Sequence, residues 1–399
     1  MKRREWLIGA LCSPAGVLTG LSPAIAKSPT EQQSVDAGLA AKPATPLAVR
    51  SSAHPGPAYA PVVAGHPLRF PRDHGAHPDF RTEWWYATGW LHAGGIDVGM
   101  QITFFRARTG HAPDNPSQFA PKQLILAHAA LAVAGEPRLR HGQRSARAGF
   151  GLAQASVSDT GLRLFDWSLE RRDGTPEGGI GTGAEHYLAI AGAEDFAFEL
   201  ILHTDTPPVL QGVQGHSRKG PMPAQASYYY SRPQLRIEGK LRIGKAGNAM
   251  QPVRGRGWLD HEWSSELLDP RATGWDWVGL NLDDGSALMA FRIRDGSGGD
   301  LWKHARWIEQ GKLRDATPRF TMLRAWRSLR SGASYPVAMR LTLDSRELEL
   351  QPLLDDQELD TRASTGTVYW EGAVRVLENG RQIGRGYLEL TGYAGRISL

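Results

Sequence analysis

The sequence from Val253 to Trp263 reads Val253-Arg-Gly-Arg-Gly-Trp258-Leu-Asp260-His261-Glu262-Trp263, and Gly274-Trp275-Asp276-Trp277 follows after a short spacer. Four tryptophans, three carboxylates and one histidine are thus concentrated within about one strand pair. Rings at this density need a large apolar body to pack against, which is either the protein core or a ligand. Burial among such rings also shifts the pKa values of acidic and imidazole groups toward proton chemistry. The stretch therefore predicts an aromatic pocket that contains acidic and imidazole groups.

Part of this stretch has a counterpart earlier in the chain. A tryptophan, a strand glycine and a turn glycine all repeat at one offset of 190 positions: Trp85 and Trp275, Gly89 and Gly279, Gly95 and Gly285. An Asp-His pair also precedes each tryptophan strand, Asp73-His74 in the first half and Asp260-His261 in the second. One constant offset over several residues indicates that the chain contains two related halves.

Strand signals dominate the remaining sequence, whereas helical periodicity of 3.6 residues is hard to find. The 46 glycines and 26 prolines favour short strands joined by many turns. The clearest strand candidates are 83–91, 98–105, 123–133, 162–169, 187–191, 197–203, 228–231, 235–243, 336–343, 368–377 and 386–393. We expect an all-β protein of two tandem antiparallel barrels or sandwiches, one over residues 66–253 and the other over residues 254–399.

The first 26 residues look like a twin-arginine signal peptide. Lys2-Arg3-Arg4 precedes a short apolar run, and Ala24-Ile25-Ala26 supplies small residues for cleavage. Residues 27–65 are rich in Ala, Pro and Ser without periodicity, which predicts a disordered linker. Export to the periplasm or beyond is the expectation. Cys12, the single cysteine, lies in this leader, so no disulfide or cysteine metal site is expected in the mature chain.

The net charge of +5 is spread along the sequence. No basic block with interleaved aromatic residues occurs, so a solvated basic surface is favoured over a nucleic-acid partner. We expect a monomer.

The stretch from Phe70 to Trp90, which contains Asp73-His74-Gly-Ala-His77 and Glu83-Trp84-Trp85-Tyr86, resembles the signature of the AttH-type, carotenoid 1,2-hydratase-like family. Segments 212–220, 226–231, 257–263 and 387–393 also match the family's pattern, so the resemblance covers nearly the whole mature chain. It implies two lipocalin-like domains in tandem, and several members of the family are described as secreted hydrolases. The export leader departs from the carotenoid enzymes and puts a carotenoid substrate in doubt.

Asp260, His261 and Glu262 are the candidate catalytic residues. Adding water to a carbon–carbon double bond needs a proton donor, a wall that tolerates a carbocation, and a positioned water. A buried Asp260 with a raised pKa can donate the proton, His261 can hold the water, and π clouds can face the cation. In the hydratases the active site resembles this mixture. The pocket is expected to be lined by Trp258, Trp263, Trp275, Trp277, Trp85 and Tyr86. The alternative is structural: Asp260 and His261 hold the crossing between the barrels, with tryptophan as core.

Strand alternation places Trp258, Asp260 and Glu262 on one face and His261 and Trp263 on the other. Both faces reach one site only if the segment bends. Asp276 should point away from Trp275 and Trp277, which leaves Asp260 as the main acid.

Three other interpretations are weaker. A metal could be held by Asp73, His74, His77 and Asp79, with Asp260 and His261 joining them, but neither a helical His pair nor a Cys pair supports it, so no metal and no cofactor are expected. The segment Gly215-His-Ser217-Arg-Lys219-Gly only vaguely resembles a serine elbow and favours a turn that carries Lys219 to the pocket mouth. Glu83 is either a buried acid or, as we favour, an outward residue or a barrel-closing partner of an arginine.

Two functions of different classes follow for the pocket. One is a hydro-lyase or hydrolase acting on an apolar isoprenoid or lipid. The other is a carrier that binds such a molecule in the periplasm and passes it to a membrane exporter.

Overall fold

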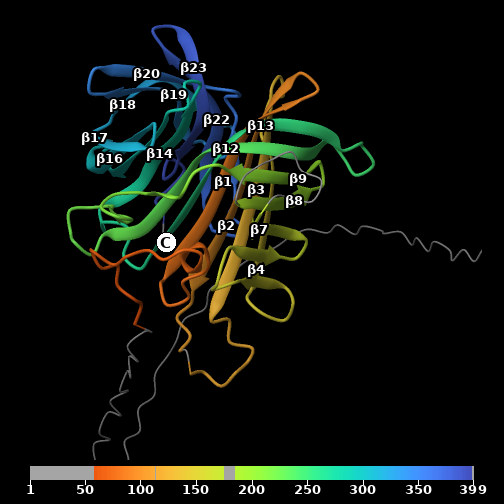
Figure 1. Cartoon of the computed structure of the whole chain (residues 1–399), viewed down its shortest axis with the longest axis vertical. Helices are drawn as coiled ribbons and strands as arrows, with labels where there is room; N and C mark the ends of the chain where they lie inside the picture. The colour runs from red at the N-terminus through yellow and green to blue at the C-terminus, as the bar shows by residue number, and fades with distance from the viewer. Residues whose placement is uncertain (1–57, 113, 175–184, 398–399) are drawn as a thin grey trace, which may run out of the picture. The chain divides into compact units, whose positions relative to one another are not determined.

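The structure, a computed structural model, describes residues 58–112, 114–174 and 185–397, and their regular secondary structure is almost entirely strand (Figure 1). Their one helical element is the short 3-10 helix η1 (Arg72–His74). In this part of the chain nothing helical has the length and apolar character that a membrane crossing requires. The expected leader, and the linker up to residue 57, lie outside the described residues. The rest of that linker is bound to the folded chain: the Ala60 N–H donates to Asp79 O at 2.9 Å, and the Val63 N–H donates to the Tyr228 hydroxyl of β12 (Ala226–Ile243) at 2.9 Å.

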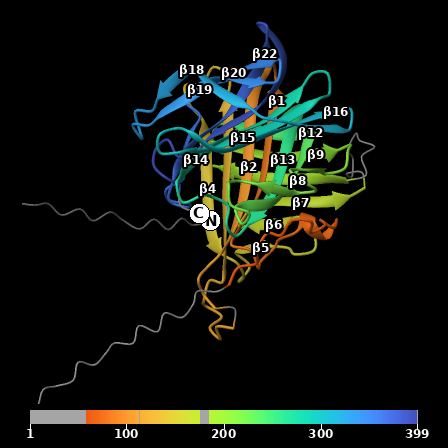
Figure 2. The ribbon, with the colours of Figure 1, turned by 90° about the vertical axis from the view of Figure 1, so that its left-hand side faces the viewer.

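The first sheet has 13 strands, all antiparallel, and its last strand in sequence pairs with its first (Figure 2). Two short strands, β10 (Val209–Leu210) and β11 (His216–Arg218), pair with β12 outside the main order. The main order is β4 (Arg140–Arg147), β3 (Gln123–Val133), β2 (Ile96–Arg108), β1 (Thr82–Ala93), β13 (Gln251–Ser264), β12 (Ala226–Ile243), β9 (Phe196–Thr204), β8 (Glu185–Ala193), β7 (Trp167–Asp173), β6 (Gly161–Leu164) and β5 (Ala153–Ala155).

The second sheet has 10 strands and repeats this arrangement, because its last strand, β23, again pairs with its first, β14. The order is β17 (Lys312–Ala316), β16 (Asp300–Glu309), β15 (Ala287–Asp295), β14 (Ala272–Leu282), β23 (Arg381–Leu390), β22 (Val368–Glu378), β20 (Arg346–Pro352), β19 (Ser334–Leu343) and β18 (Arg319–Arg327), with β21 (Glu358–Asp360) on β22. The expectation of an all-β chain with two antiparallel halves is confirmed, and the first strands of the halves, β1 and β14, begin at Thr82 and Ala272, 190 positions apart.

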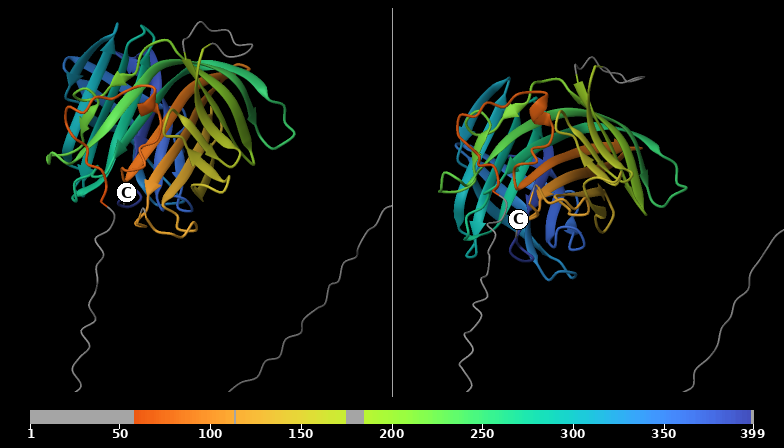
Figure 3. Two further views of the ribbon diagram at one scale, coloured as in Figure 1. Left: turned by 60° about the horizontal axis from the view of Figure 1, so that its bottom comes forward. Right: turned by 90° about the horizontal axis from the view of Figure 1, so that it is seen from below.

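Each sheet curls around a core of its own (Figure 3). The first core contains Trp85, Trp167 and Leu259, and the second contains Trp307 and Trp370. A third apolar cluster joins the outer faces of the two sheets, and its members include Tyr86, Trp258, Trp277, Phe291 and Tyr387. Side chains therefore fill the interiors of the curled sheets, and the layer between the sheets is where both halves contribute to one surface.

The expected boundary between residues 253 and 254 falls inside β13, which pairs with β1 from Val253 to Ser264. The change of sheet comes later, between Ser264 and Ala272. The two Asp-His pairs are not equivalent in structure, since Asp73 and His74 belong to η1 and Asp260 and His261 to β13. The segment expected as one strand over 162–169 is instead two strands, separated by a turn in which Phe165 has φ 57°.

Candidate functional site

A cavity lies between the two sheets, and both sheets supply its walls. We call it the acidic cavity, because four of its lining residues carry carboxyl groups. Its lining comprises Thr82, Trp84, Tyr86, Thr103, Phe105, Lys219, Asp260, Glu262, Leu267, Trp275, Trp277, Phe291, Ile293, Tyr369, Glu371 and Glu389. Seven of these side chains are aromatic rings, so the carboxyl groups stand in a largely apolar space.

Strand pairing brings these side chains to the same layer. On the first sheet Trp84 lies opposite Glu262 and Tyr86 opposite Asp260. On the second sheet Glu389 lies opposite both Trp277 and Glu371. Because side chains alternate along a strand, each pair projects to the same side of its sheet. Aromatic and acidic side chains therefore face each other across the layer.

Asp260 is 3% exposed and is held by three donors. Its Oδ1 accepts hydrogen bonds from Ser231 Oγ and Trp258 Nε1, both at 2.6 Å, and its Oδ2 accepts one from Tyr229 at 2.7 Å. Burial raises the pKa of Asp260 to about 7, although these hydrogen bonds act against the shift and nearby Glu262 adds to it. The group thus exchanges its proton near neutral pH while its position stays fixed.

Glu371 and Glu389 form a second acidic pair across β22 and β23. Like charges directly opposite each other on neighbouring strands repel, so one proton is readily retained. Burial, and then the neighbouring Glu389, raises the pKa of Glu371 well above its usual range. Burial likewise raises the pKa of Glu389 to about 7, against a hydrogen bond that Trp275 Nε1 donates at 2.9 Å.

Lys219 is the cation among the lining residues. Its Nζ lies 2.9 Å from Glu262 Oε1, and it also lies over the rings of Tyr229 and Phe291, at 4.6 and 4.2 Å from their centres. One lysine cannot compensate four carboxylates. Near neutral pH the cavity therefore retains a proton on Glu371 and, in part, on Asp260 and Glu389, and it offers rings that can face a developing positive charge.

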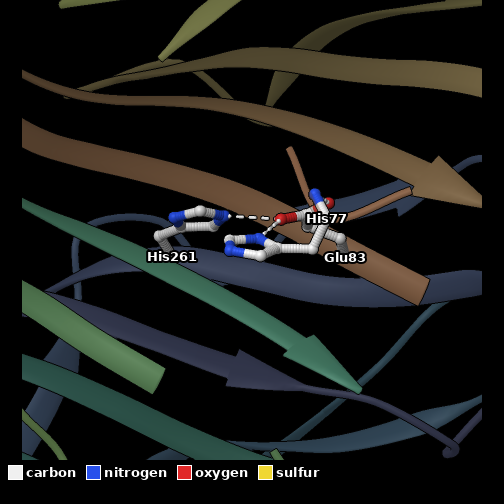
Figure 4. Close-up of side chains that lie close together, drawn as sticks. All are labelled: His77, Glu83 and His261. Carbon is white, nitrogen blue, oxygen red and sulfur yellow. Dashed lines mark hydrogen bonds and ion pairs between the residues drawn. The ribbon is translucent and has the colours of Figure 1, made fainter. Parts of the chain in front are cut away.

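His261 points to the face of β13 opposite to Asp260, and Figure 4 shows it beside Glu83 and His77. Glu83 Oε1 contacts His77 Nδ1 at 2.6 Å and His261 Nε2 at 2.9 Å. Glu83 Oε2 accepts from Arg106 Nε at 2.7 Å and from the His77 backbone N–H at 2.9 Å. Asp73 Oδ1 lies 3.2 Å from His77 Nε2. We call Asp73, His77, Glu83, Arg106 and His261 the Glu83 network.

Charge compensation sets the pKa values in the Glu83 network. Burial alone would raise the pKa of Glu83, but His77, Arg106 and the hydrogen bonds lower it well below its usual range. The pKa of His77 is raised, because Glu83 and Asp73 outweigh the effect of burial. Burial lowers the pKa of His261 to about 4, against its bond to Glu83. The network is a fully paired, hydrogen-bonded assembly that ties η1 and β1 to β13.

The ligand atoms of His77, Glu83 and His261 all lie within 4.8 Å of one another, which is close enough to consider a metal ion. The donor set argues against one, because Glu83 already accepts four hydrogen bonds and Arg106 brings a permanent positive charge to it. Asp260 cannot join this group from the other face. Glu83 combines two of the interpretations: it pairs with an arginine, Arg106 of β2, but it is a fully buried acid and not an outward residue.

The structure divides the expected site residues between these two faces. Asp260, Glu262, Tyr86, Trp275 and Trp277 line the acidic cavity, and Trp258 contacts it through Asp260. His261, Trp263 and Trp85 lie on the other face instead, where His77 stacks on Trp263 at 3.8 Å and His261 stacks on Trp85 at 4.5 Å between ring centres. The prediction that His261 shares a pocket with Asp260 is therefore wrong, because the pairing of β13 with β1 is unbroken from Val253 to Ser264 and strand alternation separates the two side chains.

Two other expectations are met. Asp276 points away from the cavity, where it pairs with Arg292 at 2.7 Å and Arg294 at 3.0 Å. Lys219 does reach the cavity. Ser217 is not activated, because its buried Oγ has no hydrogen-bond partner among the described residues.

Sequence reasoning missed Glu371, Glu389 and Tyr229. A signal for the first two exists, because each stands alone as an acid within an apolar strand, in Tyr369-Trp370-Glu371 and Leu388-Glu389-Leu390. A lone acid at such a position is rarely left on a solvated face.

Comparisons with known proteins agree with this architecture. The family model described as AttH-like matches residues 61–393. A crystal structure assigned to an AttH protein from Nitrosomonas europaea is 48% identical, covers 84% of this chain and 99% of its own, and has a TM-score of 0.75. Kievitone hydratase from Nectria haematococca shares the fold at 12% identity and a TM-score of 0.58, with 85% and 97% covered.

The structure of CghA with Sch210972 has a TM-score of 0.50 at 13% identity, with 80% of this chain and 90% of the other covered. Among curated proteins none matches the sequence. The match over residues 61–393, with nearly half of the residues identical to the Nitrosomonas protein, shows that this chain belongs to the AttH-like family.

Proposed function

We propose that the acidic cavity adds water to a carbon–carbon double bond of an apolar substrate, or removes it in the reverse direction, so that the protein acts as a hydro-lyase. The observation that carries this proposal is Asp260, an acid with a pKa of about 7 in a cavity walled by aromatic rings. A general acid works best when its pKa lies near the working pH.

In the proposed step the Asp260 carboxyl gives its proton to one carbon of the double bond, and the π electrons form the new C–H bond. The other carbon becomes a cation that faces rings such as Trp275 and Trp277. A water oxygen then bonds to this carbon and loses a proton to a carboxylate of the cavity, for which Glu389 is suited by its pKa of about 7. Transfer of a proton between the two acids restores the starting state.

The substrate class follows from the walls. Aromatic and aliphatic side chains favour an unsaturated isoprenoid or lipid chain over a polar metabolite. Kievitone hydratase shares this fold and is named for a hydration, which makes the same reaction class the first one to test.

The experiment begins with the molecule that co-purifies with the native protein, identified by mass spectrometry. Incubated with the protein in oxygen-18 water, it should gain or exchange one labelled hydroxyl group. Asp260→Asn should bind the molecule but lose turnover by a factor of about 10² to 10⁴, the usual contribution of a general acid. Asp166→Asn, a change at a carboxyl group that is 70% exposed, is the matched control. Equal binding by all forms with no label in any product would instead identify a carrier.

We also propose that residues 1–26 direct export of the folded protein. The support is the Arg3-Arg4 pair and Ala24-Ile25-Ala26. Replacing both arginines by lysine should retain the precursor in the cytoplasm, and unchanged export would refute the twin-arginine route.

A further inference from the structure

The layer between the sheets changes from acidic to basic along its length. On one face of β13, alternate residues are Arg254, Arg256, Trp258, Asp260 and Glu262. The adjacent strands of the second sheet follow the same sequence of charge. Glu371 and Glu389 lie opposite each other at one end, Ala373 and Tyr387 in the middle, and Arg375 and Arg385 at the other. The basic pair lies four residues from the acidic pair, about 13 Å along the strands.

A cleft opens at this basic end. It is lined by Trp90, His92, Arg254, Arg256, Asp283 and Arg385 among others, so three arginines face one carboxylate. It is separated from the acidic cavity by a close-packed middle. There Gly99 leaves no room for a side chain, because a Cβ atom would come within 2.5 Å of Ala373 Cβ and 2.7 Å of the Tyr387 hydroxyl. The cleft is therefore a second site and not an extension of the first.

Trp90 brings an indole N–H group to the cleft, beneath two arginines. The side chain is only 4% exposed, yet its Nε1–H has no hydrogen-bond partner among the described residues. Arg375 and Arg385 both lie over its ring, at 5.4 and 5.5 Å from the centre, and the buried Nε of Arg385 also has no partner in the described part of the chain. Leaving a buried donor unpaired has a free-energy cost, and a bound acceptor removes it.

The contacts within the protein compensate the positive charge of the arginines at the basic end only in part. Arg375 lies 3.4 Å from Asp97, which also pairs with His92 at 2.7 Å, and Arg256 donates to the neutral Gln234 side chain at 2.6 Å. Two arginines directly opposite each other on adjacent strands repel. A bound anion would relieve this repulsion and accept hydrogen bonds from the Trp90 Nε1–H and Arg385 Nε–H, which are unpaired within the described residues.

We propose that this cleft binds an oxyanion group, either free phosphate or the carboxylate of a larger molecule, through Arg385 and the Trp90 indole N–H. Guanidinium groups present paired donors that match the geometry of both groups. The site is independent of the proposed chemistry of the acidic cavity.

The test is a titration of the full mature chain with sodium phosphate and, separately, sodium acetate, at constant ionic strength set with sodium chloride. Binding is followed by the indole N–H resonance of Trp90, assigned with Trp90→Phe, and by calorimetry. A saturable shift of this resonance is expected with phosphate, with acetate or with both, and the preferred anion distinguishes a free phosphate site from a carboxylate site.

Arg385→Gln should weaken binding about tenfold or more, as expected for loss of a charged hydrogen bond. Arg254→Gln, at an exposed position, should also weaken it. Arg340→Gln is the control, since Arg340 pairs with Glu349 on other strands. The proposal is overturned if neither anion shifts the resonance saturably, or if both cleft variants bind as tightly as the wild type. Neither outcome bears on hydration in the acidic cavity, which is measured by label incorporation.

Discussion

Two clusters of buried acids and aromatic rings lie on opposite faces of β13, and their electrostatics are opposite. In the Glu83 network each oxygen of Glu83 has two donors, and its pKa is lowered. In the acidic cavity four carboxyl groups share one lysine, and the pKa values of Asp260, Glu371 and Glu389 are raised. Similar residue types in neighbouring positions thus serve different purposes. Where donors compensate the charge, the cluster holds the fold together. Where they do not, the cluster retains protons, as the proposed hydration requires.

The largest expected effect comes from breaking the compensated cluster. Arg106→Met leaves Glu83 without its arginine partner in a buried site, since both side chains are at most 2% exposed. Removing one member of a buried ion pair costs about 3–5 kcal/mol of unfolding free energy. Urea denaturation at neutral pH measures this loss.

Arg324→Met is the matched control. Arg324 pairs with Asp355 through side chains that are nearly half exposed, and such surface pairs contribute about 0–1 kcal/mol. If the two variants lost the same stability, the distinction between a compensated core cluster and an ordinary ion pair would fail.

A smaller effect of the opposite sign should follow in the acidic cavity. The folded-state pKa of Glu389 is raised from 4.5 to about 7. The folded state therefore binds the proton of Glu389 more tightly than the unfolded state does. As pH rises from about 4.5 to about 7, the Glu389 side chain consequently lowers the free energy of unfolding by an increasing amount. Glu389→Gln keeps an oxygen for Trp275 and removes the charge. Relative to wild type the variant should become more stable by about 1–3 kcal/mol across that range, a value reduced because Glu389 is only partly buried.

The measurement is the difference in unfolding free energy between variant and wild type at pH 4.5, 6 and 8. Comparing the two proteins at each pH cancels the contributions of histidines such as His77 and His261, which titrate in both. A difference that is independent of pH would mean that Glu389 is ionised throughout, and the cavity would then not hold protons as described.

The same contrast explains how far the sequence could be interpreted. The alternation of Trp258, Asp260 and Glu262 against His261 and Trp263 was readable, since it depends only on the two-residue period of a strand. The repeat of Trp85 at Trp275 predicted the two halves, although the two rings face different sides: Trp85 lies in the core of the first sheet and Trp275 in the layer between the sheets. Local patterns of this kind need no knowledge of distant partners.

What could not be read was which distant strands face each other. Glu371 and Glu389 meet Asp260 only because the outer faces of two curled sheets pack together, and no periodicity encodes that contact. The domain boundary was placed too early because β13 carries the motif of the second half but pairs with β1 of the first. His77 joined the Glu83 network from a segment whose conformation is set by tertiary contacts and not by strand propensity.

The smallest expected effect is a shift in the pKa of Asp260, which burial raises and three hydrogen-bond donors lower. Ser231 Oγ donates to Asp260 Oδ1 at 2.6 Å and so favours the ionised carboxylate. Ser231→Ala removes this donor and should raise the pKa of Asp260 above about 7, with a loss of stability of about 1 kcal/mol.

Infrared spectra of the carboxyl C=O stretch, recorded from pH 5 to pH 9 against Asp260→Asn, report the protonated fraction directly. Ser156→Ala, in a loop remote from the cavity, is the control and should leave the titration unchanged. The pKa of Asp260 is set by burial working against three donors, so removing one donor must shift it upward. An unchanged or lower value would show that solvent, and not the balance of burial and hydrogen bonds, controls this acid.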